Sequence, residues 1–314
     1  MGQTALLFPG QGSQAVGMGR DVARGSPRGR AVFARANLAL GFDLAGLCFN
    51  GPAERLDQTD IQQPAIFVTG VALWEAFVEA GGSLEEFGFA AGLSLGEYTA
   101  LHVAGAVEFE TALHLVHRRG QLMQAAADES AGGMVSLIGA DEASATLVCD
   151  RAAGNDVLVP ANYNCPGQVV LSGSAEACRR AIDVAEEMSL RAVQLPVAGA
   201  FHSPLMEPAA RSLAEELART ALRRPHIPVL ANVDENYHDG PDSIRDRLAK
   251  QLTHPVRWEG CVRRLIADGL DRAVEVGPGR VLTGLMRKID RRIEMSTLGA
   301  IDAIRSRAVE VAGR

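Results

Sequence analysis

Residues 88–100 read GFAAGLSLGEYTA, and this stretch indicates the fold of the chain. The short apolar run 87–91 ends at a turn in which Ser94 stands between two glycines, and helix-forming residues follow from about Glu97. The same order recurs at the start of the sequence, where the apolar run 4–8 ends at the glycine-rich PGQGSQ. Strands that alternate with helices in this way predict a parallel sheet covered by helices.

The rest of this α/β part follows the same pattern. Pro64 suits the first turn of a helix that stops at the glycine pair 81–82. We further expect helices at about 109–127 and 204–220, a strand at 227–232, a helix containing 251–258, a strand at 272–277 and a final helix after 279.

Between about 132 and 198 the pattern changes. We expect strands at 134–139, 157–164, 168–174 and 191–197, with helices at 141–154 and 175–189. The resulting order, β-α-β-β-α-β, is the ferredoxin-like signature. The sequence therefore predicts an α/β-hydrolase-like large domain, formed by residues 1–130 and 199–314, with a ferredoxin-like small domain inserted at 131–198. A cleft is expected between the two.

Composition excludes several classes of function. The chain has 314 residues and a net charge of −7, which disfavours nucleic-acid binding because that requires a dominant basic surface. No apolar run approaches the roughly 20 residues that cross a bilayer, so no membrane segment is expected. The five scattered cysteines contain no CxxC pair and indicate reduced thiols in a cytoplasmic protein.

Ser94 has the G-x-S-x-G spacing of a nucleophile elbow, with Gly92 and Gly96 on either side. A serine at a sharp strand-to-helix turn needs small neighbours, since the backbone folds back beneath it. The start of the following helix offers unpaired N–H groups, including that of Leu95, to an oxyanion. A purely structural turn is the alternative interpretation, and the strand before and helix after favour the functional one.

A nucleophilic serine needs a base, and His202 is the best placed of seven histidines. It lies in PVAGAFHSPLM, where the chain leaves the small domain and returns to the large one, although it could simply cap the next helix. His114 and His117 have an i, i+3 spacing that metal sites use. No third ligand accompanies them, so no metal is predicted.

Arg119 differs from Arg118 by its place on the expected helix at 109–127. Its neighbours three and four positions away are all apolar, whereas Arg118 has polar neighbours and faces water. Because a guanidinium on an apolar face needs an anion, Arg119 either forms an internal salt bridge or binds a substrate carboxylate.

The glycine-rich stretch FPGQGSQ, residues 8–14, resembles a phosphate loop only superficially. It lacks the Lys-Ser/Thr ending of a P-loop and the full G-x-G-x-x-G spacing of a dinucleotide site. Backbone N–H groups in such a turn can instead bind an oxyanion.

Taken together, these motifs resemble the malonyl-CoA:acyl carrier protein transacylase family, the acyltransferases that load fatty acid and polyketide synthases. The resemblance spans nearly the whole chain, in the order typical of the family. It is carried by LLFPGQGSQAVGMG (6–19), QQPAIF (62–67), GLSLGEYTAL (92–101), RRGQLMQ (118–124), AFHSPLM (200–206), QLTHPVRW (251–258) and EVGPGRVLTGL (275–285).

The resemblance implies a catalytic role for five of these residues. Ser94 would be the acylated nucleophile and His202 its general base. The backbone carbonyl of Gln251 would orient the imidazole in place of an acid. The backbone N–H groups of Gln11 and Leu95 would hold the oxyanion.

The resemblance also implies the substrates. Arg119 would pair with the free carboxylate of malonyl-CoA, and Phe201 matches the form that accompanies malonyl rather than methylmalonyl. The family usually has histidine before the serine, and Leu93 departs from this pattern, which leaves the acyl pocket less defined than the reaction. The acceptor would be an acidic acyl carrier protein that binds transiently, and no cofactor is expected.

A basic cluster near the C-terminus could receive that carrier protein, although ordinary solvated charges explain it equally well. The cluster consists of Arg287, Lys288, Arg291 and Arg292. Three other functions stay open at this point: a serine hydrolase that uses water, a transacylase for neutral acyl groups, and a non-catalytic module that binds carrier protein.

Overall fold

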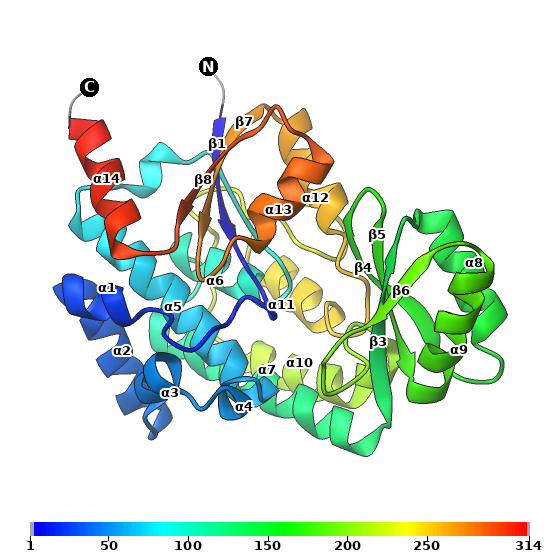
Figure 1. The fold of residues 1–314 in the computed structure, drawn as a ribbon. Coiled ribbons are helices and arrows are strands. Elements are labelled where there is room, and N and C mark those ends of the chain that lie inside the picture. Colours follow the sequence, from blue (N-terminus) through cyan, green and yellow to red (C-terminus); the bar gives the residue numbers. More distant parts are fainter. Residues whose placement is uncertain (1–2, 313–314) are drawn as a thin grey trace.

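Two separate sheets organise the chain, of which the computed structural model describes residues 3–312 (Figure 1). The first sheet is parallel throughout, and the second is antiparallel. The first has the order β2-β1-β7-β8, with bounds β2 Phe89–Gly92, β1 Gln3–Phe8, β7 Leu270–Val276 and β8 Glu294–Leu298. The predicted α/β class is therefore confirmed.

Both faces of the parallel sheet are buried, because successive side chains of a strand point to opposite faces. On β1, Leu6 and Phe8 pack into one hydrophobic core and Ala5 and Leu7 into another. The first core includes residues of α5 (Thr59–Glu79), and the second includes residues of α12 (Trp258–Ala267) and α13 (Val281–Ile289). This two-sided cover positions the carboxyl ends of the strands, where Ser94 follows β2.

The remaining helices of this part surround the sheet and its core. They are α1 (Arg20–Gly25), α2 (Pro27–Leu40), α3 (Leu44–Asn50), α4 (Ala53–Leu56), α6 (Leu95–Val103), α7 (Phe109–Glu129), α10 (Glu207–Arg219), α11 (Pro241–Lys250) and α14 (Ile301–Ala312), with single 3₁₀ turns η1 (Leu84–Glu86) and η2 (Pro204–Met206).

The second sheet, green in Figure 1, lies to one side of the first. Its order is β4-β5-β3-β6, with bounds β3 Gly132–Ile138, β4 Leu158–Cys165, β5 Gln168–Ser174 and β6 Arg191–Gln194. Helices α8 (Glu142–Ala152) and α9 (Ala175–Glu187) pack on it and share a hydrophobic core of their own. The predicted β-α-β-β-α-β order is confirmed, and this separate core supports our proposal that 131–198 form a small domain inserted between 1–130 and 199–314.

Several expected elements differ from the structure. The helix expected from Pro64 begins at Thr59, so that the proline lies inside it. The strand expected at 227–232 makes only isolated bridges, one through Val229 and one through Leu230. Segment 251–258 lies between α11 and α12 and is not helical before Trp258, and the helix after residue 279 is followed by β8 and α14.

Helix α5 is long and apolar enough to cross a membrane by length and composition, contrary to the sequence expectation. Within its most apolar window, however, 89% of the residues are buried inside the protein. It is therefore explained as the central core helix, and it contacts α2 and α7 extensively.

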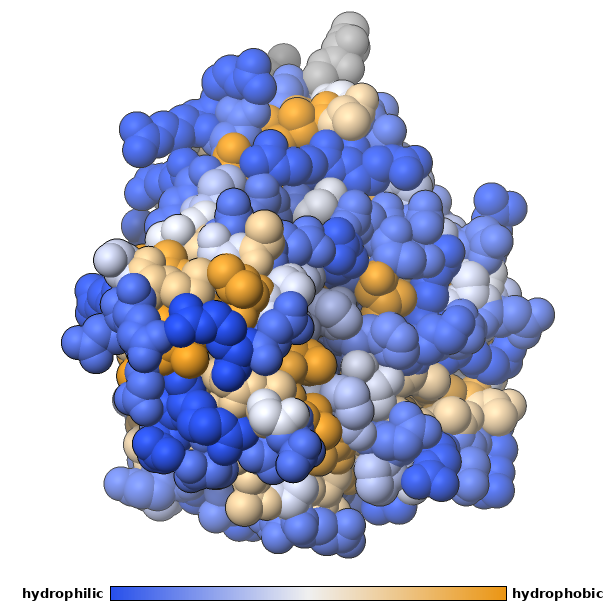
Figure 2. Space-filling model, turned by 90° about the vertical axis from the view of Figure 1, so that its right-hand side faces the viewer, coloured by the Kyte–Doolittle hydropathy of each residue, from blue (hydrophilic) through white to orange (hydrophobic). Residues whose placement is uncertain are grey.

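The surface on the side of the small sheet is mostly hydrophilic (Figure 2). Hydrophobic residues on this face form small separate groups between charged ones. Exposed hydrophobic side chains include Ile138, Leu147 and Val193 of the small sheet and its helices. All five cysteines are buried and free.

Candidate active site

Ser94 lies at a sharp turn between β2 and α6, in a conformation that residues other than glycine rarely adopt. Its φ and ψ angles are 51° and −102°. The turn is so tight that a Cβ on Gly92 would lie 1.9 Å from the carbonyl carbon of Gly96, and a Cβ on Gly96 2.0 Å from the carbonyl oxygen of Phe8. Strain of this kind is concentrated at functional sites.

His202 lies next to Ser94, at the point where the chain has returned from the small sheet. The Ser94 Oγ is 3.0 Å from His202 Nε2, and His202 Nδ1 is 2.7 Å from the backbone carbonyl oxygen of Gln251. When Nδ1–H donates to that carbonyl, Nε2 is left as an acceptor for the serine hydroxyl. The structure thus brings a hydroxyl, an imidazole and an orienting carbonyl into one chain of hydrogen bonds.

Burial lowers the pKa of His202 to about 4, from an ordinary value of 6.5. The nearby Arg119 cation also lowers the pKa, and the hydrogen bond to Gln251 opposes the shift. The imidazole is therefore uncharged at neutral pH and can accept a proton.

Arg119, on α7, is only 1% exposed, and its guanidinium points at Ser94. It donates to Gln63 Oε1 at 2.6 Å, to Ser94 Oγ at 2.9 Å and to Gln251 Oε1 at 2.9 Å. Within residues 3–307, whose side chains the structure describes, it has no carboxylate partner, so the internal salt bridge considered above is not found there. Arg118, by contrast, is half-exposed and pairs with Glu216 at 3.6 Å.

A cavity of about 220 Å³ opens above the serine, between the parallel sheet and the small antiparallel sheet. Ser94, His202, Leu93 and Phe201 line it from the larger part. Its remaining walls are mostly apolar and consist of Gln11, Met123, Met134, Asn162, Asn164, Gln168, Val170, Leu195, Val197, Val281 and Leu285. The cavity is suited to a small acyl group with a flexible, partly apolar carrier.

Two backbone N–H groups beside this cavity are free to receive an oxyanion. Leu95 begins α6, and Gln11 lies in the glycine-rich turn after β1 and lines the cavity. Among the residues described, neither N–H has a hydrogen-bond partner. Unpaired N–H groups at a helix start are the usual oxyanion donors.

Four residues of the site were not predicted from the sequence. Gln63 accepts a hydrogen bond from Arg119, although its motif QQPAIF was recognised. Asn232 accepts from the backbone N–H of Ser94 at 2.6 Å. Glu97 and His238 form a fully buried pair behind the turn. The signal for Glu97 was its position three residues after Ser94, on the first turn of a buried helix.

The histidine pair on α7 does not enter the site. His114 and His117 line a surface groove on α7, with Arg118 and Glu216. In the described part of the chain, no three histidine, cysteine, aspartate or glutamate side chains gather in a way that could hold a metal ion.

The sequence and the structure of the chain are similar to those of known proteins of one family. Residues 5–300 match the family model of the acyl transferase domain. The chain is 44% identical to the malonyl CoA-acyl carrier protein transacylase of Escherichia coli (strain K12), over 97% of this chain and 98% of that protein. The structure of the malonyl CoA-acyl carrier protein transacylase from Coxiella burnetii superposes with a TM-score of 0.95, at 40% identity and 98% coverage of both chains.

The structure also resembles that of a protein solved in complex with its partner. A malonyl-transacylase solved together with its type II polyketide synthase acyl carrier protein superposes with a TM-score of 0.94 and is 39% identical. The match covers 98% of this chain and 99% of that one.

Proposed function

Because the chain belongs to the acyl transferase domain family, we propose that it transfers a malonyl group from malonyl-CoA to the phosphopantetheine thiol of acyl carrier protein. The enzyme is a malonyl-CoA:acyl carrier protein S-malonyltransferase of fatty acid or polyketide biosynthesis. One observation carries the choice of malonyl: the buried guanidinium of Arg119 has no carboxylate partner within residues 3–307 and contacts the Oγ of Ser94.

In the first half of the reaction, Ser94 is acylated. His202 Nε2 takes the hydroxyl proton while Oγ attacks the thioester carbonyl of malonyl-CoA. The N–H groups of Gln11 and Leu95 stabilise the resulting oxyanion, each by about 3 kcal/mol in comparable sites. The C–S bond then breaks, His202 returns the proton to the sulfur, and coenzyme A leaves.

In the second half, the same groups act in reverse. His202 takes the proton from the thiol of the carrier protein, whose sulfur attacks the malonyl ester on Ser94. A second oxyanion forms at the same N–H groups and collapses, the ester bond breaks, and His202 returns the proton to Ser94. Neither half requires a metal or a cofactor, and we expect none.

Arg119 distinguishes this function from its rivals. A hydrolase, or a transacylase for neutral acyl groups, would leave an unpaired cation buried beside its nucleophile, at a large cost in free energy. A malonyl carboxylate offers the guanidinium two oxygens in a planar arrangement that matches its own. Phe201 and Leu93 line the cavity where the rest of the acyl group would lie.

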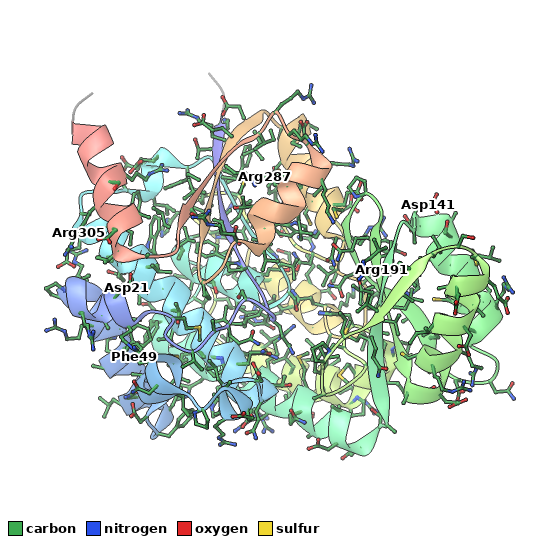
Figure 3. All side chains as sticks on the ribbon, viewed as in Figure 1. Asp21, Phe49, Asp141, Arg191, Arg287 and Arg305 are labelled. Atoms are coloured by element: carbon green, nitrogen blue, oxygen red, sulfur yellow. The ribbon has the colours of Figure 1, made fainter. Side chains whose placement is uncertain are left out.

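The acceptor is expected to be an acidic carrier protein that docks transiently in the cytoplasm. All four residues of the basic cluster are exposed, and Figure 3 labels Arg287, which lies on α13. Arg292 already pairs with Asp290 at 2.6 Å, and within residues 3–307 the other three cations have no ion-pair partner and could meet an acidic protein. The cluster consists of Arg287, Lys288, Arg291 and Arg292.

The direct test of this function is a transfer assay. The protein, malonyl-CoA and a holo carrier protein should yield malonyl-carrier protein together with free coenzyme A. Thioester loss that is equally fast without carrier protein, and that yields free malonate, would instead identify a hydrolase. If no thioester is lost and no acyl-enzyme forms, the protein is a non-catalytic binding module.

The pH dependence follows from His202. Since the neutral imidazole is the base and its pKa is lowered to about 4, acylation of Ser94 should not decline as the pH falls through 6.5. It should decline only as the pH approaches about 4. Stopped-flow acylation across this range measures the profile, and a half-maximal rate near pH 6.5 would contradict it.

Stability must be followed over the same range. The unfolded chain binds a proton at His202 near pH 6.5, whereas the folded chain does so only near 4. The free energy of unfolding therefore decreases as the pH falls between these values. Measuring the free energy of unfolding at each pH therefore shows whether a loss of acylation rate comes from unfolding or from protonation of His202.

Phe201 offers a test of acyl selectivity. The ring is buried and lines the cavity, so Phe201→Ser should make room for the extra methyl group of methylmalonyl-CoA. We expect the ratio of kcat/KM for methylmalonyl-CoA to that for malonyl-CoA to rise about tenfold. Competition between the two thioesters measures this ratio, and an unchanged ratio would remove Phe201 from the acyl pocket.

A further inference from the structure

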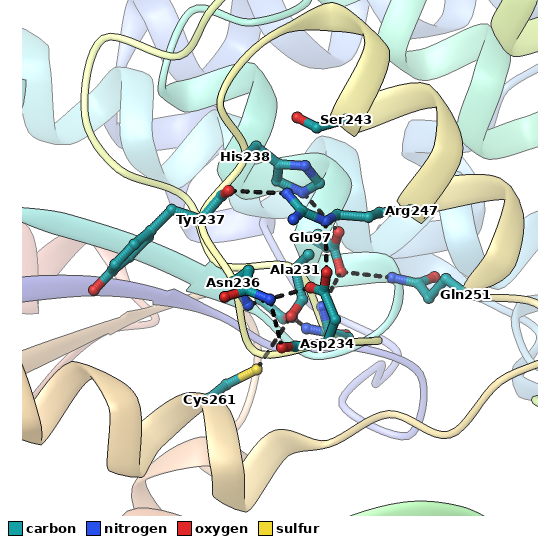
Figure 4. A network of polar contacts seen from close by, with 12 residues as sticks. Glu97, Ala231, Asp234, Asn236, Tyr237, His238, Ser243, Arg247, Gln251 and Cys261 are labelled. Carbon is teal, nitrogen blue, oxygen red and sulfur yellow. Dashed lines mark hydrogen bonds and ion pairs between the residues drawn. The ribbon is translucent and has the colours of Figure 1, made fainter.

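A buried carboxylate that the reaction does not use lies directly behind the catalytic serine. Glu97, on the first turn of α6, is 1% exposed, and Figure 4 shows it at the centre of a network of polar contacts. Its Oε2 accepts from the backbone N–H of Asn232 at 2.9 Å and from Gln251 Nε2 at 2.8 Å, and its Oε1 is 2.9 Å from His238 Nε2. A charged acceptor with three donors is fixed firmly in a buried site.

One arm of this network leads to the base and to the substrate cation. Gln251, which Glu97 holds by its amide nitrogen, receives Arg119 Nη2 on its amide oxygen at 2.9 Å. The backbone carbonyl of the same residue accepts from His202 Nδ1 at 2.7 Å. Fixing this one glutamine therefore fixes both the imidazole and the guanidinium.

The other arm leads to the strained turn. Asn232 is completely buried, and its Oδ1 accepts from the backbone N–H of Ser94 at 2.6 Å. Its Nδ2 donates to the carbonyl of Gly92 at 2.8 Å. Because Glu97 holds the backbone of Asn232, it also supports the clamp that keeps Ser94 at its unfavourable φ angle.

The amide of Gln251 also separates two opposite charges. Burial lowers the pKa of Arg119, and Tyr98 and then the negative charge of Glu97 oppose this effect. A direct ion pair would stabilise the cation more strongly but would occupy the donors that a substrate carboxylate needs. With an amide between them, the guanidinium keeps a nearby counter-charge and remains able to bind an anion.

We propose that Glu97 is a positioning residue of the acyl transfer, which holds Arg119 and His202 through Gln251 and Ser94 through Asn232. This inference rests on the proposed function, because it assigns Arg119 to the malonyl carboxylate. It adds a buried acid to a site in which a backbone carbonyl, rather than an acid, orients the histidine.

The test compares Glu97→Gln with a matched variant, Glu275→Gln. Glu275 is also completely buried and also accepts three hydrogen bonds, from Leu282 N, Thr283 N and Thr283 Oγ1, but among the described residues it forms no hydrogen bond with the network. Glutamine keeps the volume of the side chain in both variants while it removes the charge and turns one acceptor into a donor.

Two rates are measured for each folded variant: labelling of Ser94 by an uncharged fluorophosphonate, and kcat/KM for malonyl-CoA. For Glu97→Gln we expect labelling to fall about tenfold and kcat/KM to fall about 100-fold, since malonyl transfer depends on Arg119 as well. Glu275→Gln should lower the unfolding midpoint and leave both rates near those of the wild type.

The proposal is overturned if Glu97→Gln leaves both rates unchanged. It is also overturned if Glu97→Gln and Glu275→Gln lower the labelling rate and kcat/KM by the same factors. Should Glu97→Gln fail to fold, Gln251→Met removes the amide link and keeps the backbone carbonyl. As with Glu97→Gln, labelling should then fall about tenfold and kcat/KM for malonyl-CoA about 100-fold, and unchanged rates would refute the link. A wild type that labels at Ser94 but never takes up malonyl refutes the proposed function instead.

Discussion

Replacing Ser94 by alanine is expected to abolish malonyl transfer, with kcat lowered by about 10⁴-fold or more. The change removes the hydroxyl oxygen that contacts both the His202 imidazole, at 3.0 Å, and the Arg119 guanidinium, at 2.9 Å. Without it no acyl-enzyme forms, and the base has no proton to take. A continuous assay of coenzyme A release, together with intact mass after quenching, measures the loss.

The same variant should still bind malonyl-CoA, because Arg119 and the cavity are intact. Its dissociation constant, measured by calorimetry, should remain within a few-fold of the KM of the wild type if acylation is slow relative to dissociation. Transfer by Ser94→Ala at a rate similar to that of the wild type would show that another nucleophile carries the malonyl group.

Replacing Arg119 by alanine should have the second largest effect. Removing one partner of a buried charge pair typically costs about 2 to 5 kcal/mol, so kcat/KM for malonyl-CoA should fall by about 30-fold to several thousand-fold. Arg118→Ala provides the matched control, because the neighbouring side chain is half-exposed and reaches only Glu216. It should change kcat/KM little.

The two arginine variants should behave alike toward an uncharged reagent. Fluorophosphonate labelling of Ser94 needs the turn and the imidazole but no anion site, so Arg119→Ala should retain most of it. If Arg119→Ala keeps its preference for malonyl-CoA over acetyl-CoA, the carboxylate is bound elsewhere. A wild type that uses acetyl-CoA as well as malonyl-CoA, with a ratio that Arg119→Ala does not change, would instead indicate a transacylase for neutral acyl groups.

Much of the fold could be predicted from local patterns. Strand–turn–helix order gave the parallel sheet, and the block at 132–198 gave the β-α-β-β-α-β order, because strands and helices there alternate with clear turn signals. The start of α5 was misplaced because Pro64 fits both a first helical turn and the inside of this buried helix. The prediction of a strand at 227–232 was wrong, because an apolar run alone does not show whether the segment pairs with a neighbouring strand along its length.

The site was predictable where one residue type limits the chemistry. Ser94 between glycines and Arg119 on an apolar helix face could each be singled out from spacing, and the structure places both beside His202. Asn232 and His238 could not, because their roles depend on contacts with residues more than a hundred positions away. Ordinary polar residues in loops carry no local signal of such contacts.

The most direct test of the account is a mass measurement on the wild-type protein after brief incubation with malonyl-CoA. We expect one malonyl group per chain, located on Ser94 by peptide mapping and released when holo carrier protein is added. Incubation with acetyl-CoA in place of malonyl-CoA should leave the protein unmodified, because acetyl lacks the carboxylate that we propose Arg119 binds. An unmodified protein, or malonyl attached to another residue, would contradict the account.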